Sequence, residues 1–392
     1  DARSYRLTNI DMMRGLVIII MAIDHVRDFF YLSGVQDPMN DPEISIAMYL
    51  TRWITHFCAP VFVFLAGTSI GLMSSRKSNS ELSKFLLKRG IWLIFIELVI
   101  ITNGYTFSLF GDPFNGNILI IFQVIWAIGV SMVIMSGAVY LGAKNCLIIG
   151  AMIVLGHNLL DYVFPLRASG GTNTILAGLM HTRGAIVNPP FIFGMVYPVF
   201  PWLGIMMVGF GSAFIFKKNP VQRDQLLRKI GFLMIAAFLL IRFIGVYGES
   251  NPWQVQEAGL LATVFDFMNL SKYPPSIAFT LATLGPMAIL CSFADKWQGW
   301  LKDTLIMFGR VPLVFYIAHF YLIHTLVMIY GVMLGHDAIQ FARMFGSYPD
   351  GFGTGLGGVY LVWLMVLMIL YPLCKWMASL KQRRKDWWLS YV

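Results

Sequence analysis

The amino-acid sequence predicts an all-α, polytopic integral membrane helix bundle with about ten transmembrane helices and both termini in the cytosol. The 392 residues are 57% hydrophobic and 12% charged, whereas about 25% of the residues of an ordinary soluble domain are charged. Several apolar stretches exceed the roughly 20 residues that a helix needs to cross a bilayer. The uneven distribution of the basic residues supplies the predicted orientation.

We expect a single domain over residues 1–392. Its first span carries charge within its apolar run and is too long to be a cleavable signal peptide. The four cysteines are scattered and form no C-x-x-C pair, so each is expected to be a buried apolar residue. The ten expected spans are 9–33, 44–74, 84–103, 117–141, 145–164, 193–216, 226–247, 274–294, 304–333 and 355–379.

Basic residues concentrate on the side of the membrane that holds the N-terminus. If that side is the cytosol, 22 of the 29 lysines and arginines lie there, including Arg3, Arg6 and Lys385. This asymmetry is the positive-inside rule. It accounts for the net charge of +9 without nucleic acid as a partner. The outer loops then hold Arg167, Arg183, Lys272 and Arg343.

The first span, RGLVIIIMAIDHVRDFF, carries polar residues on one helical face. The face follows from spacings of three and four residues. An ionisable group at bilayer depth costs roughly 2.5–3.5 kcal/mol, so such a face is expected to line a cavity or meet a partner. Alternatively, Asp11 and Arg14 form an ion pair at the helix start, and Arg27 and Asp28 lie at the interface. The face comprises Asp11, Arg14, Val17, Met21, His25 and Asp28.

Other spans also contain polar residues. In the second span, Pro60 is expected to kink the helix near His56. In the fifth, His157 and Asp161 are four residues apart, which suits a hydrogen-bonded pair on an α-helix. In the ninth, His319 and His324 are about 140° apart, so only one is expected to meet the polar face. Gln123 is a buried amide in the fourth span. Alternatively, each of these side chains forms a structural hydrogen bond between two helices.

Five ordered stretches resemble the bacterial branch of the heparan-alpha-glucosaminide N-acetyltransferase family, from about residue 7 to residue 378. They are NIDMMRGLVIIIM, THFCAPVFVFLAGTSIGL, GHNLLD, LSKYPPSIAFTLATLGP and FGRVPLVFYIAHFYLIH. Arg14 and His25 also match the R-x10-H signature of the acyltransferase-3 superfamily. The resemblance implies a multi-helix enzyme that passes acetyl groups from cytosolic acetyl-CoA to an extracytoplasmic amino sugar. In this chain, His25 occupies a position where those relatives have an asparagine.

The residues and the resemblance together give candidate roles. His25 is the expected base, oriented by Asp24 or Asp28, with an oxyanion donor from His56, His319 or Gln123. An acetyl-histidine intermediate is a second route. No H-x-x-x-H spacing is present, so no metal is expected. A proton-coupled transporter or flippase is the alternative function. Supporting polar groups are His157 and Asp161, and candidates for the coenzyme phosphates are Arg14, Lys88, Arg89 and Arg310.

The expected partners are membrane lipid, acetyl-CoA and a saccharide acceptor, and the resemblance also allows a homodimer. The expected location is a bacterial inner membrane. The acceptor itself is not specified by any motif.

Overall fold

A computed structural model of the chain describes residues 7–32, 38–40, 44–107, 117–163, 175–342, 348–384 and 386–391. It is mostly helical, at 75%, and it forms two compact units. Unit one contains residues 1–58, 99–119 and 295–392, and unit two contains residues 59–98 and 120–294. Five of the basic residues used above to predict orientation lie outside the described residues: Arg3, Arg6, Arg167, Arg343 and Lys385.

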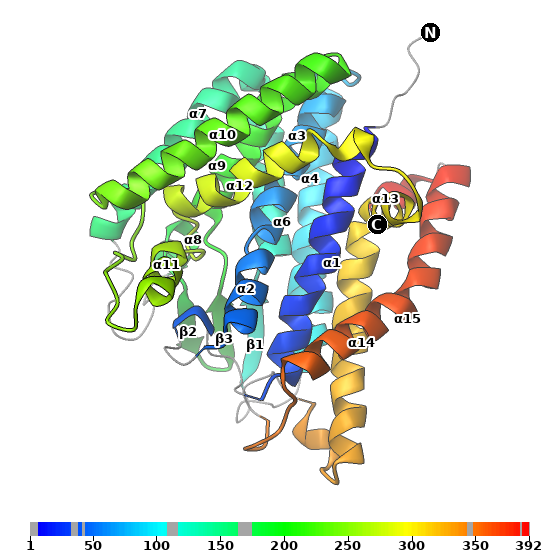
Figure 1. Cartoon of the computed structure of the whole chain (residues 1–392). Coiled ribbons are helices and arrows are strands. Elements are labelled where there is room, and N and C mark those ends of the chain that lie inside the picture. The colour runs from blue at the N-terminus through cyan, green and yellow to red at the C-terminus, as the bar shows by residue number, and fades with distance from the viewer. Residues whose placement is uncertain are drawn as a thin grey trace. The chain divides into compact units, whose positions relative to one another are not determined.

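Unit one is built mainly from long helices drawn from both ends of the chain. α1 packs against α13, α14 and α15, and Figure 1 shows α1 and α14 side by side. Its elements are α1 (Thr8–Phe30), η1 (Pro38–Asn40), α2 (Ile46–Thr55), α5 (Thr102–Thr106), α13 (Trp300–Arg310), α14 (Pro312–Met333), η7 (Ala338–Gln340), α15 (Leu356–Arg383) and η8 (Trp387–Ser390).

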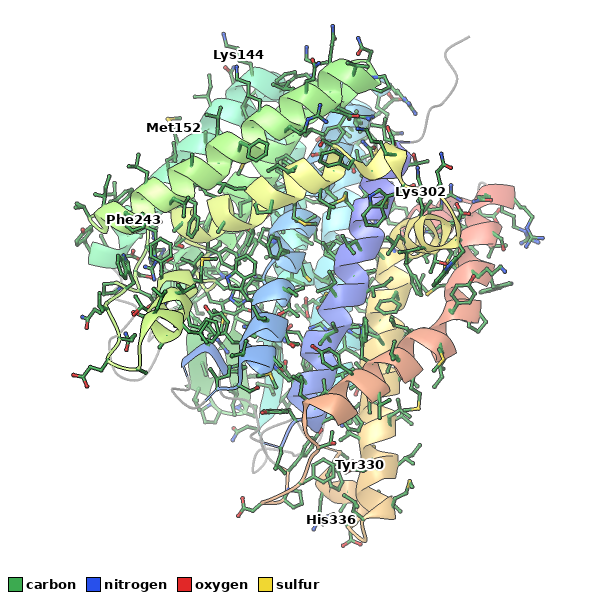
Figure 2. The ribbon with its side chains drawn as sticks, in the orientation of Figure 1. Lys144, Met152, Phe243, Lys302, Tyr330 and His336 are labelled. Carbon is green, nitrogen blue, oxygen red and sulfur yellow. The ribbon has the colours of Figure 1, made fainter. Side chains whose placement is uncertain are left out.

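Two glycines allow α1 and α13 to approach closely. A Cβ atom on Gly15 would lie 1.8 Å from the carbonyl oxygen of Leu305, and one on Gly309 would lie 1.7 Å from that of Asp11. Glycine at both positions therefore brings the polar start of α1 against the end of α13. Figure 2 shows Lys302 at this end of unit one, with Tyr330 and His336 at the opposite end. α15 bends along its length (Figure 1) and contains Pro372, which removes one helical hydrogen bond.

Unit two contains the middle of the chain. Its most extensive helix–helix contacts join α4 to α6, α7 to α9 and α10 to α12. The elements are α3 (Cys58–Met73, whose first residue belongs to unit one), α4 (Asn79–Phe95), α6 (Val124–Ala138), η3 (Val139–Leu141), α7 (Gly142–Gly156), η4 (His157–Tyr162), α8 (Ile175–Met180), α9 (Val199–Gly211), η5 (Ser212–Lys217), α10 (Pro220–Ile244), α11 (Leu260–Met268) and α12 (Ile277–Cys291). The π-helix η2 (Ile96–Ile101) crosses the boundary between the units along the chain, and so does η6 (Ala294–Lys296).

The expectation of an all-α fold is wrong in one respect, because three short strands form a sheet in the order β1–β3–β2. β2 (Gly184–Asn188) and β3 (Phe191–Met195) are antiparallel, with Gly184 opposite Met195. β1 is Ile118–Phe122, at the start of the span expected over 117–141. This segment is a short run of isoleucine, leucine and phenylalanine, and such a run suits a strand as well as a helix.

Several expected spans are divided. The span 44–74 breaks between α2 and α3 at His56 and Phe57, because the ring of Pro60 clashes with a helical carbonyl four residues earlier. The span 304–333 divides at Val311, and Pro312 begins α14. Between α6 and α7, Gly142 has a φ of 81°, a left-handed conformation that favours glycine.

Six helical segments among the described residues are long and apolar enough to cross a membrane. One of them, Val124–Tyr162, combines two of the expected spans. The chain is thus a membrane protein, while the count of about ten spans, the cytosolic termini and the single domain stay predictions. The six segments are Ile46–Met73, Val124–Tyr162, Val199–Lys217, Ile277–Lys296, Pro312–Met333 and Leu356–Arg383.

Candidate functional site

The centre of the candidate site is a pair of histidines on α1 and α14 of unit one. The Nδ1 atom of His25 lies 2.7 Å from the Nε2 atom of His319. The ring centroids are 4.9 Å apart and the ring planes are inclined by 29°, so the two rings meet edge to edge through these nitrogens. His319 is completely buried, whereas His25 is half-buried. The structure therefore brings together two residues that the sequence analysis selected from opposite ends of the chain.

Aromatic side chains surround this histidine pair. The ring of Phe320 has its centroid 4.4 Å from the centroids of both histidines. Tyr316 and Tyr105 contact His25 edge-on, at 6.1 Å and 6.5 Å. An apolar environment of this kind strengthens any electrostatic interaction that forms inside it. The few polar atoms that contact His25 would therefore have a strong effect on the energy of a proton transfer to its ring.

The acidic residues next to His25 contact arginines. Asp24 lies 2.6 Å from Nη1 of Arg52 on α2 and 3.2 Å from Nη1 of Arg27. Arg27 also donates to Asp28, with 2.6 Å between Nη2 and Oδ1. These two aspartates and two arginines form a charge-balanced group in which each carboxylate has a cationic partner. Orientation of His25 by Asp24 or Asp28 would have to coexist with these ion pairs.

A second group lies near the start of α1, where Arg14 and Arg310 share the carboxylate of Asp11. The distances are 3.4 Å from Arg14 Nη1 and 3.9 Å from Arg310 Nε. Asp11 is 4% exposed at its side chain, while the two arginines are 20% and 24% exposed. Lys381 on α15 donates to the carbonyl oxygen of Arg310 at 3.3 Å. This cluster carries more positive than negative charge and reaches solvent, so it suits an anion such as a phosphate.

Sequence reasoning missed Lys381 as a member of this cluster. Lys381 is one of the 22 basic residues assigned to the cytosol, and no local pattern connects it to Arg310. The other two predicted phosphate ligands, Lys88 and Arg89, lie on α4 in unit two. Lys88 is exposed and Arg89 is half-buried. Their role beside the Arg14 and Arg310 pair stays a prediction.

His56 and Gln123 occupy helix ends. His56 is buried at the C-terminal end of α2, where its Nδ1 atom donates to the carbonyl oxygen of Arg52 at 2.8 Å. Gln123 is the residue immediately before α6.

Glu97 is a buried acid that the sequence patterns did not identify. It is the single acid in the run IELVII of η2. Glu97 is fully buried and accepts a hydrogen bond from the backbone N–H of Trp126, in the first turn of α6, at 3.0 Å.

The expected pair between His157 and Asp161 is not the pair that forms. Asp161 contacts Nε2 of His181 at 2.5 Å and accepts from Asn158 at 3.1 Å. His157 instead donates from Nδ1 to the carbonyl oxygen of Val154 at 3.0 Å. The reason is that residues 157–162 form a 3-10 helix. In that helix, residues three apart, such as Asn158 and Asp161, share a face, and residues four apart do not.

The two histidines of α14 face different surroundings, as their spacing predicted. His319 meets His25, whereas His324 lies with Nδ1 2.8 Å from the carbonyl oxygen of Gly104 and Nε2 2.7 Å from that of Phe341. Across the parts of the chain that the structure describes, no three His, Cys, Asp or Glu side chains are grouped so that they could hold a metal ion.

Comparison with known proteins supplies the family. A search of curated proteins finds no match. The family model described as "Heparan-alpha-glucosaminide N-acetyltransferase, catalytic" matches residues 6–247, which is more than half of the chain. The match includes His25, Asp24, Asp28 and His56, and it ends before His319. The chain therefore belongs to the heparan-alpha-glucosaminide N-acetyltransferase family, a family of acetyltransferases.

Proposed function

We propose that the protein transfers an acetyl group from cytosolic acetyl-CoA to the amino group of a glucosamine-type sugar on the extracytoplasmic side of a bacterial inner membrane. The family assignment supports acetyl transfer to a glucosaminide and gives no support to the transporter alternative. The observation that carries the proposal is that α1 holds both a cationic cluster at Arg14 and a histidine pair at His25. Those two positions are about 16 Å apart along the helix.

The cationic cluster fits the donor substrate. Coenzyme A has an anionic nucleotide end and a long, mostly neutral arm that ends in the thioester. Arg14 and Arg310 would hold the phosphates by charge-assisted hydrogen bonds. Lys381 is a third cation at the same place. The arm would then extend along α1 toward His25, and the acetyl group would arrive in the aromatic surroundings described above.

The histidine pair fits the chemistry of transfer. His25 would take the proton that the acceptor amine loses as its nitrogen bonds to the acetyl carbon and the carbon–sulfur bond breaks. The departing thiolate then receives that proton as the free thiol. A hydrogen-bond donor to the developing oxyanion would also contribute, because removal of a good donor of this kind typically costs about 100-fold to 1,000-fold in kcat. His56 would serve as this donor in its protonated form, because its Nδ1–H already donates to the carbonyl oxygen of Arg52. Because both nitrogens of His319 already have polar neighbours, His319 suits this donor role less well.

The sidedness of the proposal follows from charge. Arg14, Arg310 and Lys381 lie in the segments that the positive-inside rule assigns to the cytosol. Lys302 lies at one end of unit one and His336 at the other (Figure 2), which agrees with a cytosolic loop and an outer loop at those positions. This arrangement would let each substrate approach from its own aqueous side, so neither has to cross the bilayer.

The direct test uses the purified full chain in lipid nanodiscs with acetyl-CoA and glucosamine. Free thiol and N-acetylglucosamine should form in equal amounts, and His25→Ala should lower kcat by about 100-fold to 10,000-fold. His336→Gln is the control, because His336 lies at the far end of α14 from the cationic cluster. Rapid quenching with labelled acetyl-CoA and no acceptor tests the acetyl-histidine route. Wild-type protein that neither binds nor consumes acetyl-CoA would refute the proposed function.

A further inference from the structure

We propose that His319 is a positioning residue that holds His25 in the tautomer whose Nε2 atom carries the lone pair. The inference rests on the proposed function, because it assigns the basic atom of the residue that accepts the proton. It also explains how a base can be oriented at a place where the neighbouring carboxylates are paired with arginines.

The carbonyl oxygen of Phe315 can only accept a hydrogen bond. Nδ1 of His319 lies 3.1 Å from the carbonyl oxygen of Phe315, one turn earlier on α14. Nδ1 of His319 must therefore carry a hydrogen. A neutral imidazole has a single N–H, so the Nε2 atom of His319 has a lone pair and accepts.

The tautomer of His319 determines the tautomer of His25. Since Nε2 of His319 accepts, Nδ1 of His25, 2.7 Å away, is the atom that donates. In neutral His25 the remaining nitrogen, Nε2, then carries the lone pair. The hydrogen-bond chain runs in one direction, from His25 through His319 to the carbonyl oxygen of Phe315. The basic atom of His25 is thereby specified by the backbone of another helix.

The ring of His319 is held rigidly by its aromatic neighbours. His319 is completely buried, and its ring is stacked on that of Phe315 with the planes inclined by only 8°. Phe320 packs against both histidines. A ring held on both sides in this way cannot turn freely to exchange its nitrogens. The chain of hydrogen bonds is therefore a fixed property of the folded helix pair.

This arrangement differs in a useful way from orientation by a carboxylate. Asp24 and Asp28 have arginine partners, so the tautomer of neutral His25 is set here by an uncharged histidine and not by a carboxylate. When His25 receives a proton at Nε2, its Nδ1–H continues to donate to His319. No hydrogen bond has to be rearranged during the reaction, which is the condition for a preorganised site.

The first experiment reads the tautomer directly. Full-length protein labelled with nitrogen-15 in its histidines is studied by solid-state NMR in lipid bilayers, with His25→Gln used to assign the signals. We expect a protonated Nδ1 and an unprotonated Nε2 for neutral His25. In His319→Leu, we expect the population to shift toward protonated Nε2. A wild-type His25 with its hydrogen on Nε2 would overturn the inference, whether or not the protein transfers acetyl groups.

The second experiment separates positioning from binding. His319→Leu should lower kcat by about 100-fold to 10,000-fold and leave the Kd for acetyl-CoA within about twofold. His319→Gln should recover at least about tenfold of that loss, because its amide oxygen can accept from Nδ1 of His25. Equal activity in wild type, His319→Leu and His319→Gln would also overturn the inference. If His319→Leu does not fold, the wild-type tautomer and the His319→Gln activity still decide the matter. Absence of acetyl transfer in wild type would refute the proposed function alone.

Discussion

The Nη1 atom of Arg52 lies 2.6 Å from the Oδ2 atom of Asp24, so a buried ion pair joins α2 to α1 immediately beside His25. The side chains are 6% and 14% exposed. Removal of one partner from a buried pair leaves an uncompensated charge and costs about 3–5 kcal/mol.

Arg52→Leu should therefore lower the free energy of unfolding by about 3 kcal/mol, the lower end of that range. The lower end applies because Arg27 also contacts Asp24. Unfolding in detergent micelles, followed by circular dichroism, measures the change. Arg384→Ala is the control, since Arg384 is 66% exposed and exposed pairs contribute about 0–1 kcal/mol. Equal effects of the two variants would show that the Arg52 pair is not structural.

Gly309→Ala should separate α1 from α13. The added methyl group would lie 1.7 Å from the carbonyl oxygen of Asp11, and backbone cannot move away as a flexible side chain can. We expect a loss of about 3 kcal/mol in the free energy of unfolding, the upper end of the usual range for overpacking. Gly137→Ala is the matched control within a helix, because a Cβ atom there meets nothing within 4 Å. That variant should be stabilised by about 0.5–1 kcal/mol.

Glu97 should be replaceable by glutamine but not by alanine. Its side chain accepts the N–H of Trp126 in the first turn of α6. Glu97→Ala leaves this buried donor unsatisfied and should cost about 1–3 kcal/mol, whereas Glu97→Gln keeps an oxygen acceptor. Thermal unfolding of both variants tests the difference. If glutamine is as harmful as alanine, the carboxylate has a further role.

His181 should be coupled to Asp161 more strongly than His157 is. A double-mutant cycle with His181→Ala and Asp161→Asn should give a coupling energy of about 1.5–3 kcal/mol, the value for a hydrogen bond to a charged group. The cycle with His157→Phe and Asp161→Asn should give a clearly smaller coupling energy, because His157 donates to the carbonyl oxygen of Val154 and not to Asp161. The opposite pattern would support the pairing that α-helical spacing suggests.

Glu81 should make the start of α4 sensitive to acid. Its carboxylate accepts from the backbone N–H and the hydroxyl group of Ser78, both at 2.9 Å, and these hydrogen bonds lower the pKa of Glu81. A lowered folded-state pKa means that this contribution is present above the ordinary pKa of glutamate and is lost as the pH falls through the lowered value.

Hydrogen-exchange protection of the Ser78 and Glu81 amides, measured by NMR, should therefore decrease below about pH 4. Glu81→Gln keeps an acceptor that does not titrate, so its protection factors should not change with pH. A wild-type protection factor that is constant to low pH would contradict this prediction.

Local patterns in the sequence predict much of the fold, and they predict the individual histidines of the site but not their pairing. Helical periodicity placed His25 on the inner face of the first span, and the spacing of His319 and His324 predicted that only one of them meets that face. Both outcomes depend only on the 3.6-residue repeat within one helix. The pairing of His25 with His319 joins residues 294 positions apart, and no local pattern contains that information.

Helical periodicity does not predict three other features of the structure: the strand β1, the pairing of Asp161 with His181, and the contact of Glu97. The apolar run at Ile118–Phe122 suits a strand as well as a helix, and it forms β1. Asp161 meets His181 because the helix tightens to a 3-10 form after Gly156. No local pattern predicts the contact of Glu97, a single acid in an apolar run. Its partner is the backbone of α6, which begins 27 residues later.

The way unit one is assembled from distant segments has a consequence for biogenesis. At about 5–20 residues per second, a ribosome needs about 15–60 s to make the 294 residues that separate His25 from His319. On the predicted topology, α1 would spend that interval in the membrane before its packing partner α14 is made. The partners of the Asp24–Arg52 pair are only 28 residues apart, so on this topology the pair would balance the charge of Asp24 long before α14 is synthesised.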